Sequence, residues 1–167
     1  INVTGLGDSK APTVDDISFS TTNVDTSDAS TRWIDVTFNN LTDDISGIDY
    51  LTINYKSPSG NNTVSASVNV QAPEVLSKSS LTGEMQFNEY AESGDWTFDY
   101  IHVYDKAGNY KTYYGNDLDF VPSDITVRNG ISDDGDISNF SDNKAPTVDS
   151  ISFSTTNVDT SDASTRW

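Results

Sequence analysis

Residues 31–39 read TRWIDVTFN, and this stretch decides the fold class. Ile34, Val36 and Phe38 alternate there with polar residues. Successive side chains of a strand point to opposite faces, so the pattern predicts a strand with one buried face. Residues 63–70, TVSASVNV, alternate in the same way. The sequence therefore predicts β-strands and not helices.

The same alternation continues outward from these two stretches. A phase change of one residue between Phe98 and Ile101 predicts a β-bulge. Clusters of turn-forming residues, such as 57–61, separate the apolar stretches. The last two stretches could be two parts of one interrupted strand. The sequence thus indicates an all-β sandwich of about seven to eight antiparallel strands, expected over residues 14–20, 31–39, 48–56, 63–70, 84–90, 96–104, 110–114 and 124–128.

A near-exact internal repeat divides the chain. The segment KAPTVDDISFSTTNVDTSDASTRW at the start recurs near the end, with Asp16 replaced by Ser150. A match of this length indicates a unit from a tandem array. We expect a tail of a preceding unit at 1–9, one sandwich unit at 10–128, an acidic linker at 129–143, and the first strands of the next unit at 144–167.

Composition narrows the classes of partner. Twenty-six acidic residues against nine basic ones give a formal net charge of −17, and the chain has no cysteine. Because phosphate binding needs a basic surface, we expect no nucleic-acid partner. No apolar stretch reaches transmembrane length, so we expect no membrane insertion. Divalent cations with oxygen ligands would offset the charge, and the Ser-, Thr-, Asn- and Asp-rich composition suits a secreted protein.

Five short motifs occur in a characteristic order. In this order and spacing they resemble the bacterial immunoglobulin-like repeats of large secreted adhesins and surface proteins. The resemblance implies an immunoglobulin-like β-sandwich at the cell surface, acting as a non-enzymatic spacer whose partners are neighbouring repeats and which is often stabilised by calcium. The linker at 129–143 is longer than the usual junction. The motifs are APT at 11–13, DDISG at 43–47, SPSG at 57–60, GDWTF at 94–98 and DKAGN at 105–109.

Strand order predicts that several acidic residues meet at one end of the sandwich. The loops after the second and sixth strands should lie at the end where the chain enters. Calcium binds six to eight oxygen ligands, so we expect a Ca²⁺ site there. The alternative is ordinary turn chemistry, because Asp and Asn often bond to the local backbone in turns. The candidate ligands are Asp8, Asp15, Asp16, Asp43, Asp44, Asp105 and Asn109.

A second acidic group lies in the predicted linker. Asp133, Asp134 and Asp136 surround a glycine and resemble part of a calcium loop. The spacing does not fit a complete EF-hand. A solvated acidic linker is the alternative.

Catalytic features are sparse in this sequence. The single histidine, His102, is expected to point outward from its strand, and no Gly-x-Ser-x-Gly motif is present. We therefore expect no enzyme. Tyr100, Tyr104, Tyr110 and Tyr114 could form an aromatic stripe that stacks on sugars, which keeps a glycan-binding module as an alternative. Cross-strand pairing that stabilises the sheet is the simpler interpretation.

The duplicated segment suggests a further alternative. Residues 144–167 should fit the position that residues 10–33 occupy in another copy. Donation between molecules is a head-to-tail contact, and such contacts build homopolymers. A self-assembling extracellular filament or surface-layer subunit is therefore a second hypothesis beside the spacer.

Overall fold

The computed structural model describes residues 7–71, 76–129 and 147–150, and these residues form a β-protein without an α-helix. Two 3-10 helices, η1 (Ala29–Thr31) and η2 (Gly115–Asp117), interrupt the strands. The nine strands are β1 (Asp16–Phe19), β2 (Asn23–Asp25), β3 (Trp33–Thr42), β4 (Ile48–Lys56), β5 (Thr63–Asn69), β6 (Ser77–Gln86), β7 (Gly94–Asp105), β8 (Tyr110–Tyr113) and β9 (Ile125–Arg128).

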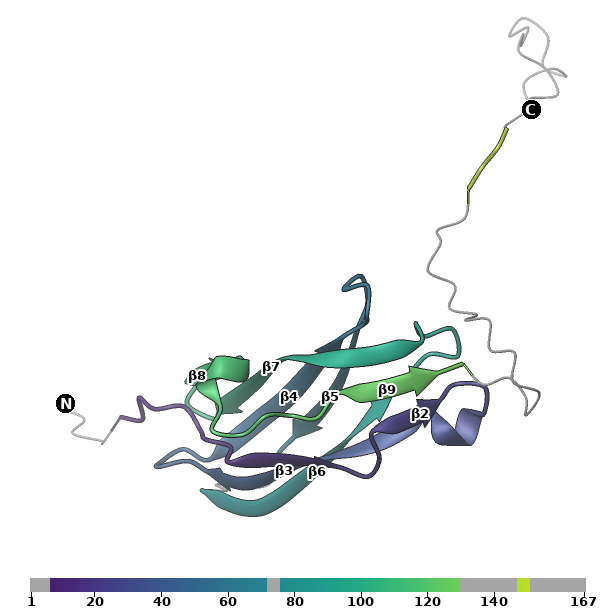
Figure 1. Ribbon diagram of the computed structural model, residues 1–167. Helices are drawn as coiled ribbons and strands as arrows, with labels where there is room; N and C mark the ends of the chain where they lie inside the picture. The colour runs from purple at the N-terminus through teal and green to yellow at the C-terminus, as the bar shows by residue number, and fades with distance from the viewer. Residues whose placement is uncertain (1–6, 72–75, 130–146, 151–167) are drawn as a thin grey trace, which may run out of the picture.

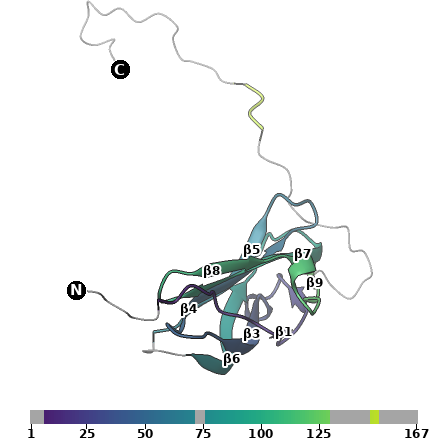
Figure 2. The ribbon, with the colours of Figure 1, turned by 90° about the vertical axis from the view of Figure 1, so that its left-hand side faces the viewer.

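The strands follow one continuous path, β1-β3-β6-β5-β4-β7-β9-β2, with β8 paired to β7 beside it. Figure 2 shows that this sheet curls, with β1, β3 and β6 on one side and β4, β7 and β8 on the other. The expectation of purely antiparallel strands is wrong at one place, because β2 pairs with β9 in parallel. Both strands run in the same direction along the molecule, so the short β2 joins β9 in parallel.

The core confirms the alternation in the sequence. Val36 and Phe38 on β3 are fully buried, as is Tyr55 on β4. The Tyr55 ring has edge contacts with Phe19 at 5.9 Å and with Phe98 at 6.0 Å between ring centroids. Strands from both sides of the curl therefore share one hydrophobic core.

The phase change in β7 is a bulge, as predicted. Tyr55 pairs with Phe98 and the adjacent Asn54 pairs with Tyr100, so Asp99 has no partner on β4. The extra residue returns Ile101 to the buried face.

Three strand predictions differ from the structure. Residues 77–81, which lie between the predicted strands 63–70 and 84–90, form the first half of β6, and residues 87–90 lie beyond its end. The short β2 was not predicted. In the first half of β6 and in β2, the backbone pairs with a neighbouring strand while most side chains stay exposed. No apolar alternation therefore marks these two strands in the sequence. The strands β8 and β9 both pair with β7, consistent with one interrupted strand.

Entry and exit of the domain lie at opposite ends. Figure 1 shows the first described residues passing beside β8, whereas β9 runs toward the other end of the molecule. We call these the entry end and the exit end. Within the described part of the chain, no helix is long and apolar enough to cross a membrane.

Candidate metal centre

Two loops meet at the entry end, as the predicted strand order requires. The β3–β4 loop, residues 43–47, and the β7–β8 loop, residues 106–109, are joined by hydrogen bonds. Lys106 donates its N–H to the Gly47 carbonyl at 3.0 Å, and Ala107 donates its N–H to the Ser46 hydroxyl at 3.2 Å. These bonds fix the spacing between Asp43 in the first loop and Asp105, the last residue of β7.

Three carboxylates face one another at this junction. Asp8, Asp43 and Asp105 each offer one oxygen, and these oxygens all lie within 4.8 Å of one another. We call the three residues the aspartate triad. Calcium–oxygen distances are about 2.3–2.6 Å, so two ligands of one ion lie at most about 5 Å apart. One ion could therefore contact all three carboxylates.

Asp43 uses its two carboxylate oxygens differently. Its Oδ2 accepts the backbone N–H of Gly47 at 2.6 Å and that of Ile45 at 3.2 Å. Its Oδ1 is buried from solvent and has no hydrogen-bond partner among the described residues. A buried, unpaired polar atom costs about 1–3 kcal/mol, and more when it is charged. An unpaired carboxylate oxygen in a member of the triad is available to a cation.

Asp105 is the most deeply placed member, with 2% of its surface exposed. Its Oδ1 accepts the backbone N–H of Asn109 at 2.7 Å, and its Oδ2 accepts the Asn109 side-chain amide at 2.7 Å. Gly108 permits this tight turn with a φ of 88°. The loop thus holds a buried carboxylate in a fixed orientation.

Asp8 connects the entering chain to the β3–β4 loop. Its Oδ2 accepts the backbone N–H of Ser46 at 2.9 Å, and its Oδ1 accepts the backbone N–H of Lys10 at 3.2 Å. Hydrogen bonds from Ser46 lower the pKa of the Asp8 carboxyl below its usual value. The carboxylate form of Asp8 is therefore favoured. Asp8 belongs to residues 1–9, which the sequence assigned to the tail of a preceding unit, and yet it contacts the loop of this unit.

The other predicted ligands lie outside the triad. Asp15 and Asp16 are exposed along the first strand region, and the Asp16 carboxylate accepts a 3.4 Å hydrogen bond from Asn39. Asp44 pairs with Lys10 at 2.8 Å, and Asn109 donates to Asp105. The predicted second group, Asp133, Asp134 and Asp136, lies outside the described residues.

The sequence did not predict the backbone groups that shape the centre. The Gly47 and Ser46 amides each fix one oxygen of a triad member, and Gly47 has a φ of 85°. The bond from the Ile45 amide to Asp43 is an Asx-turn, which the Asp-x-x-x-Gly spacing could have suggested. Asp43 thus accepts the turn hydrogen bonds through Oδ2, while its Oδ1 has no hydrogen-bond partner among the described residues.

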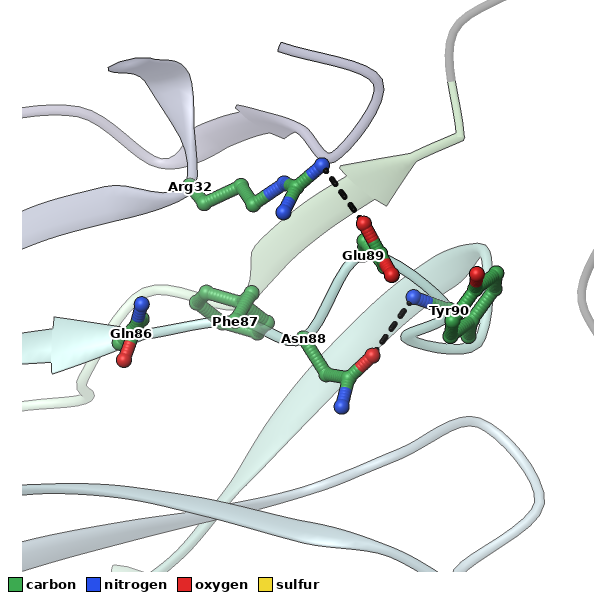
Figure 3. A pocket seen from close by; sticks show the side chains of 6 residues that line it. All are labelled: Arg32, Gln86, Phe87, Asn88, Glu89 and Tyr90. Atoms are coloured by element: carbon green, nitrogen blue, oxygen red, sulfur yellow. Dashed lines mark hydrogen bonds and ion pairs between the residues drawn. The ribbon is translucent and has the colours of Figure 1, made fainter. Parts of the chain in front are cut away.

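A polar recess of about 500 Å³ lies at the exit end, where β6 ends. Figure 3 shows Arg32 pointing toward Glu89 across it, and the Arg32 Nη2 lies 3.4 Å from the Glu89 carboxylate. The Arg32 Nε also donates to the Thr26 carbonyl at 2.7 Å. A hydrogen bond with Glu89 raises the pKa of Tyr90, whose side chain is largely exposed. The recess carries charged and aromatic groups at the opposite end from the triad.

His102 and the tyrosines form a continuous strip on β7 and β8. Tyr104 and Tyr110 stack with their centroids 5.3 Å apart, and His102 lies 4.5 Å from Tyr100. The His102 Nδ1 is 2.7 Å from the Thr112 hydroxyl. Tyr104 and Tyr110 contact each other across β7 and β8, which is the arrangement of a cross-strand stabilising pair, whereas Tyr100 and His102 are neighbours on one face of β7.

Comparison with known proteins gives no match for this chain among family models, curated proteins or solved structures.

Proposed function

We propose that this chain is a calcium-stabilised spacer unit of an extracellular repeat protein. The aspartate triad, with its buried and unpaired Asp43 oxygen, is the observation that carries the proposal. Calcium bound there would link the entering segment at Asp8 to both loops of the entry end. Binding would therefore stiffen the point at which the preceding unit joins.

Ligand chemistry favours calcium for this position. All three triad ligands are carboxylate oxygens, and the chain has no cysteine and a single histidine. Zinc prefers nitrogen and sulfur ligands, whereas calcium accepts carboxylates, backbone carbonyls and water. A divalent cation would also reduce repulsion in a chain of net charge −17.

The places where the chain enters and leaves the described domain support a spacer. Entry beside β8 and exit after β9 lie at opposite ends, so each successive unit would add length (Figure 1). The recurrence of the first segment after a linker supports a tandem array. A unit that extends an array requires no catalytic site, so we propose a non-enzymatic role at the cell surface.

Strand pairing is consistent with an immunoglobulin-like arrangement. The first strand β1 pairs with β3, and the following β2 crosses to pair in parallel with β9. The first segment thus pairs with two different strands, and the core is filled from two sides. We propose that this arrangement is an immunoglobulin-like sandwich.

Thermal unfolding of the full chain with calcium or with chelator tests the proposal. Calcium at 100 times its dissociation constant should stabilise the fold by about 2.7 kcal/mol. That corresponds to a rise in midpoint on the order of 10 °C for a domain of this size. Magnesium at the same concentration should give a smaller rise, because it loses its water reluctantly.

Asp43→Asn is the matched variant for this measurement. Its amide oxygen can still accept the Gly47 N–H, while its amide nitrogen then takes the position of the unpaired oxygen. We expect the turn to persist and the calcium-dependent rise to disappear. Asp35→Asn, on the exposed face of β3, removes one charge elsewhere and should keep the full rise. Equal rises in the two variants would contradict the proposal.

A further inference from the structure

One side of the curled sheet presents twelve outward positions that hold no Asp, Glu, Lys or Arg. The strands β5, β4, β7 and β8 lie next to one another on this side (Figure 2). Core residues such as Ile53, Ala66 and Val103 alternate along these strands with residues that point away from the core. We call the residues that point away the outer face, and they are Ser65, Ser67, Asn69, Tyr50, Thr52, Asn54, Tyr100, His102, Tyr104, Tyr110, Thr112 and Tyr114.

Charged residues border the outer face without entering it. Asp49 lies at one border on β4, and Lys56 pairs with Asp99 at 2.8 Å at the other. On the other side of the curled sheet, the exposed Asp35 of β3 is the register partner of the exposed Glu84 of β6. Like charges at such positions destabilise a sheet, and yet the chain keeps them there. Sheet formation therefore does not account for an uncharged outer face in a chain of net charge −17.

Aromatic rings form one connected network across the outer face. Neighbouring rings of the network lie 4.5–6.3 Å apart between centroids. The Nδ1 of His102, the central ring, is 2.7 Å from the Thr112 hydroxyl. Rings that their neighbours already hold in place lose little conformational freedom when a ligand binds. The network consists of Tyr50, Tyr104, Tyr110, His102, Tyr100 and Tyr114.

Two rings of the network are open to solvent. Tyr110 is 62% exposed and stacks on Tyr104 at an interplanar angle of 22°, so one of its faces is covered and the other is open. Tyr114 is 55% exposed and has an edge contact with Tyr100. Strands rise about 3.4 Å per residue, so these two positions lie roughly 13 Å apart along β8. Open rings at this spacing can contact different units of one chain-like ligand.

We propose that the outer face binds a neutral polysaccharide, with Tyr110 and Tyr114 as its stacking platforms. The apolar face of a sugar ring packs on an aromatic ring, and sugar hydroxyls form hydrogen bonds with hydroxyl and amide side chains. The exposed Ser65, Ser67 and Asn69 of β5 supply such groups beside the rings. A polyanion would be repelled by the net charge, and a cationic ligand would find no carboxylate within the face. This inference does not rest on the proposed calcium site.

Affinity electrophoresis of the full chain tests the proposal. Native gels contain dextran, galactomannan or arabinoxylan as neutral probes, and hyaluronan as the polyanionic control. At least one neutral polysaccharide should retard the chain relative to a gel without polysaccharide. Hyaluronan should not retard it, because both carry negative charge.

Substitutions at the open rings locate the binding. Tyr110→Ala and Tyr114→Ala should each weaken the retardation by roughly tenfold in apparent affinity, because each removes one stacking platform. Tyr110→Phe keeps the ring and should bind as the wild type does. Tyr90→Ala is the matched control, since Tyr90 is 68% exposed at the exit end and lies outside the outer face. Thermal midpoints close to that of the wild type should show that every variant is folded.

Four results would overturn the proposal. The first is the absence of retardation by all three neutral polysaccharides, and the second is equal retardation by hyaluronan. The third is a loss of binding in Tyr90→Ala as large as that in Tyr110→Ala. The fourth is a concentration-dependent dimer in sedimentation that Tyr110→Ala abolishes, because a second copy of this chain would then be the occupant of the outer face.

Discussion

A single side chain, Asp43, combines a structural and a candidate binding role. One of its oxygens closes the β3–β4 turn, and the other is buried without a partner. The sequence predicted that Asp43 would lie near Asp105, because strand order alone places their loops at one end. It could not predict the burial of Asp105, because an aspartate in a turn motif is exposed more often than buried.

Trp96 is the side chain whose removal should affect the core most clearly. It is 3% exposed, its ring has an edge contact with Phe87 at 5.3 Å, and its Nε1 donates to the Glu92 carbonyl at 2.8 Å. Trp96→Ala removes the ring and leaves a cavity. We expect the free energy of unfolding to fall by about 3–5 kcal/mol, measured by urea denaturation.

Trp33→Ala is the matched control for that substitution. Trp33 begins β3 on its outward face and is 46% exposed. Its loss should change the free energy of unfolding by about 1 kcal/mol or less. Similar losses for the two tryptophans would show that burial does not distinguish them.

At the scale of elements, β5 depends on two unequal contacts. It forms a seven-residue ladder with β4, but only Ala66 and Met85 are paired between β5 and β6. Gly83 on β6 lies where the two strands approach, and a Cβ there would be 2.9 Å from the Ser67 carbonyl oxygen. The absence of a side chain at position 83 lets β6 continue the sheet past β5.

Gly83→Ala should therefore separate β5 from β6. Because the added methyl group meets backbone, we expect a loss of about 1–3 kcal/mol in the free energy of unfolding, measured by chemical denaturation. Gly115→Ala is the control, since a Cβ there has no atom within 4 Å. If both variants keep wild-type stability, the close approach of the two strands is not a constraint.

Elements were predictable where side chains alternate between core and solvent. The predicted range for β4 agrees at both ends, because Leu51, Ile53 and Tyr55 all point into the core. The first half of β6 and the whole of β2 were missed, because backbone pairing at an edge leaves little trace in apolar spacing. Sequence therefore predicts the core-forming strands better than the strands that close the edges.

The whole molecule has two different ends. The aspartate triad lies at the entry end, and the recess lined by Arg32, Glu89 and Tyr90 lies at the exit end. The sequence predicted the acidic end through strand order, but it did not predict the recess, because the residues that line it share no motif. A molecule with unlike ends and one repeated segment is suited to head-to-tail arrays, which is the basis of the proposed spacer role.

Calorimetric titration of calcium into the chelator-treated full chain tests the central claim most directly. The account predicts saturable binding that Asp43→Asn reduces by one ion per chain, while Asp35→Asn binds as the wild type does. Wild-type stoichiometry in Asp43→Asn, or no saturable binding in the wild type, would contradict a calcium site at the aspartate triad.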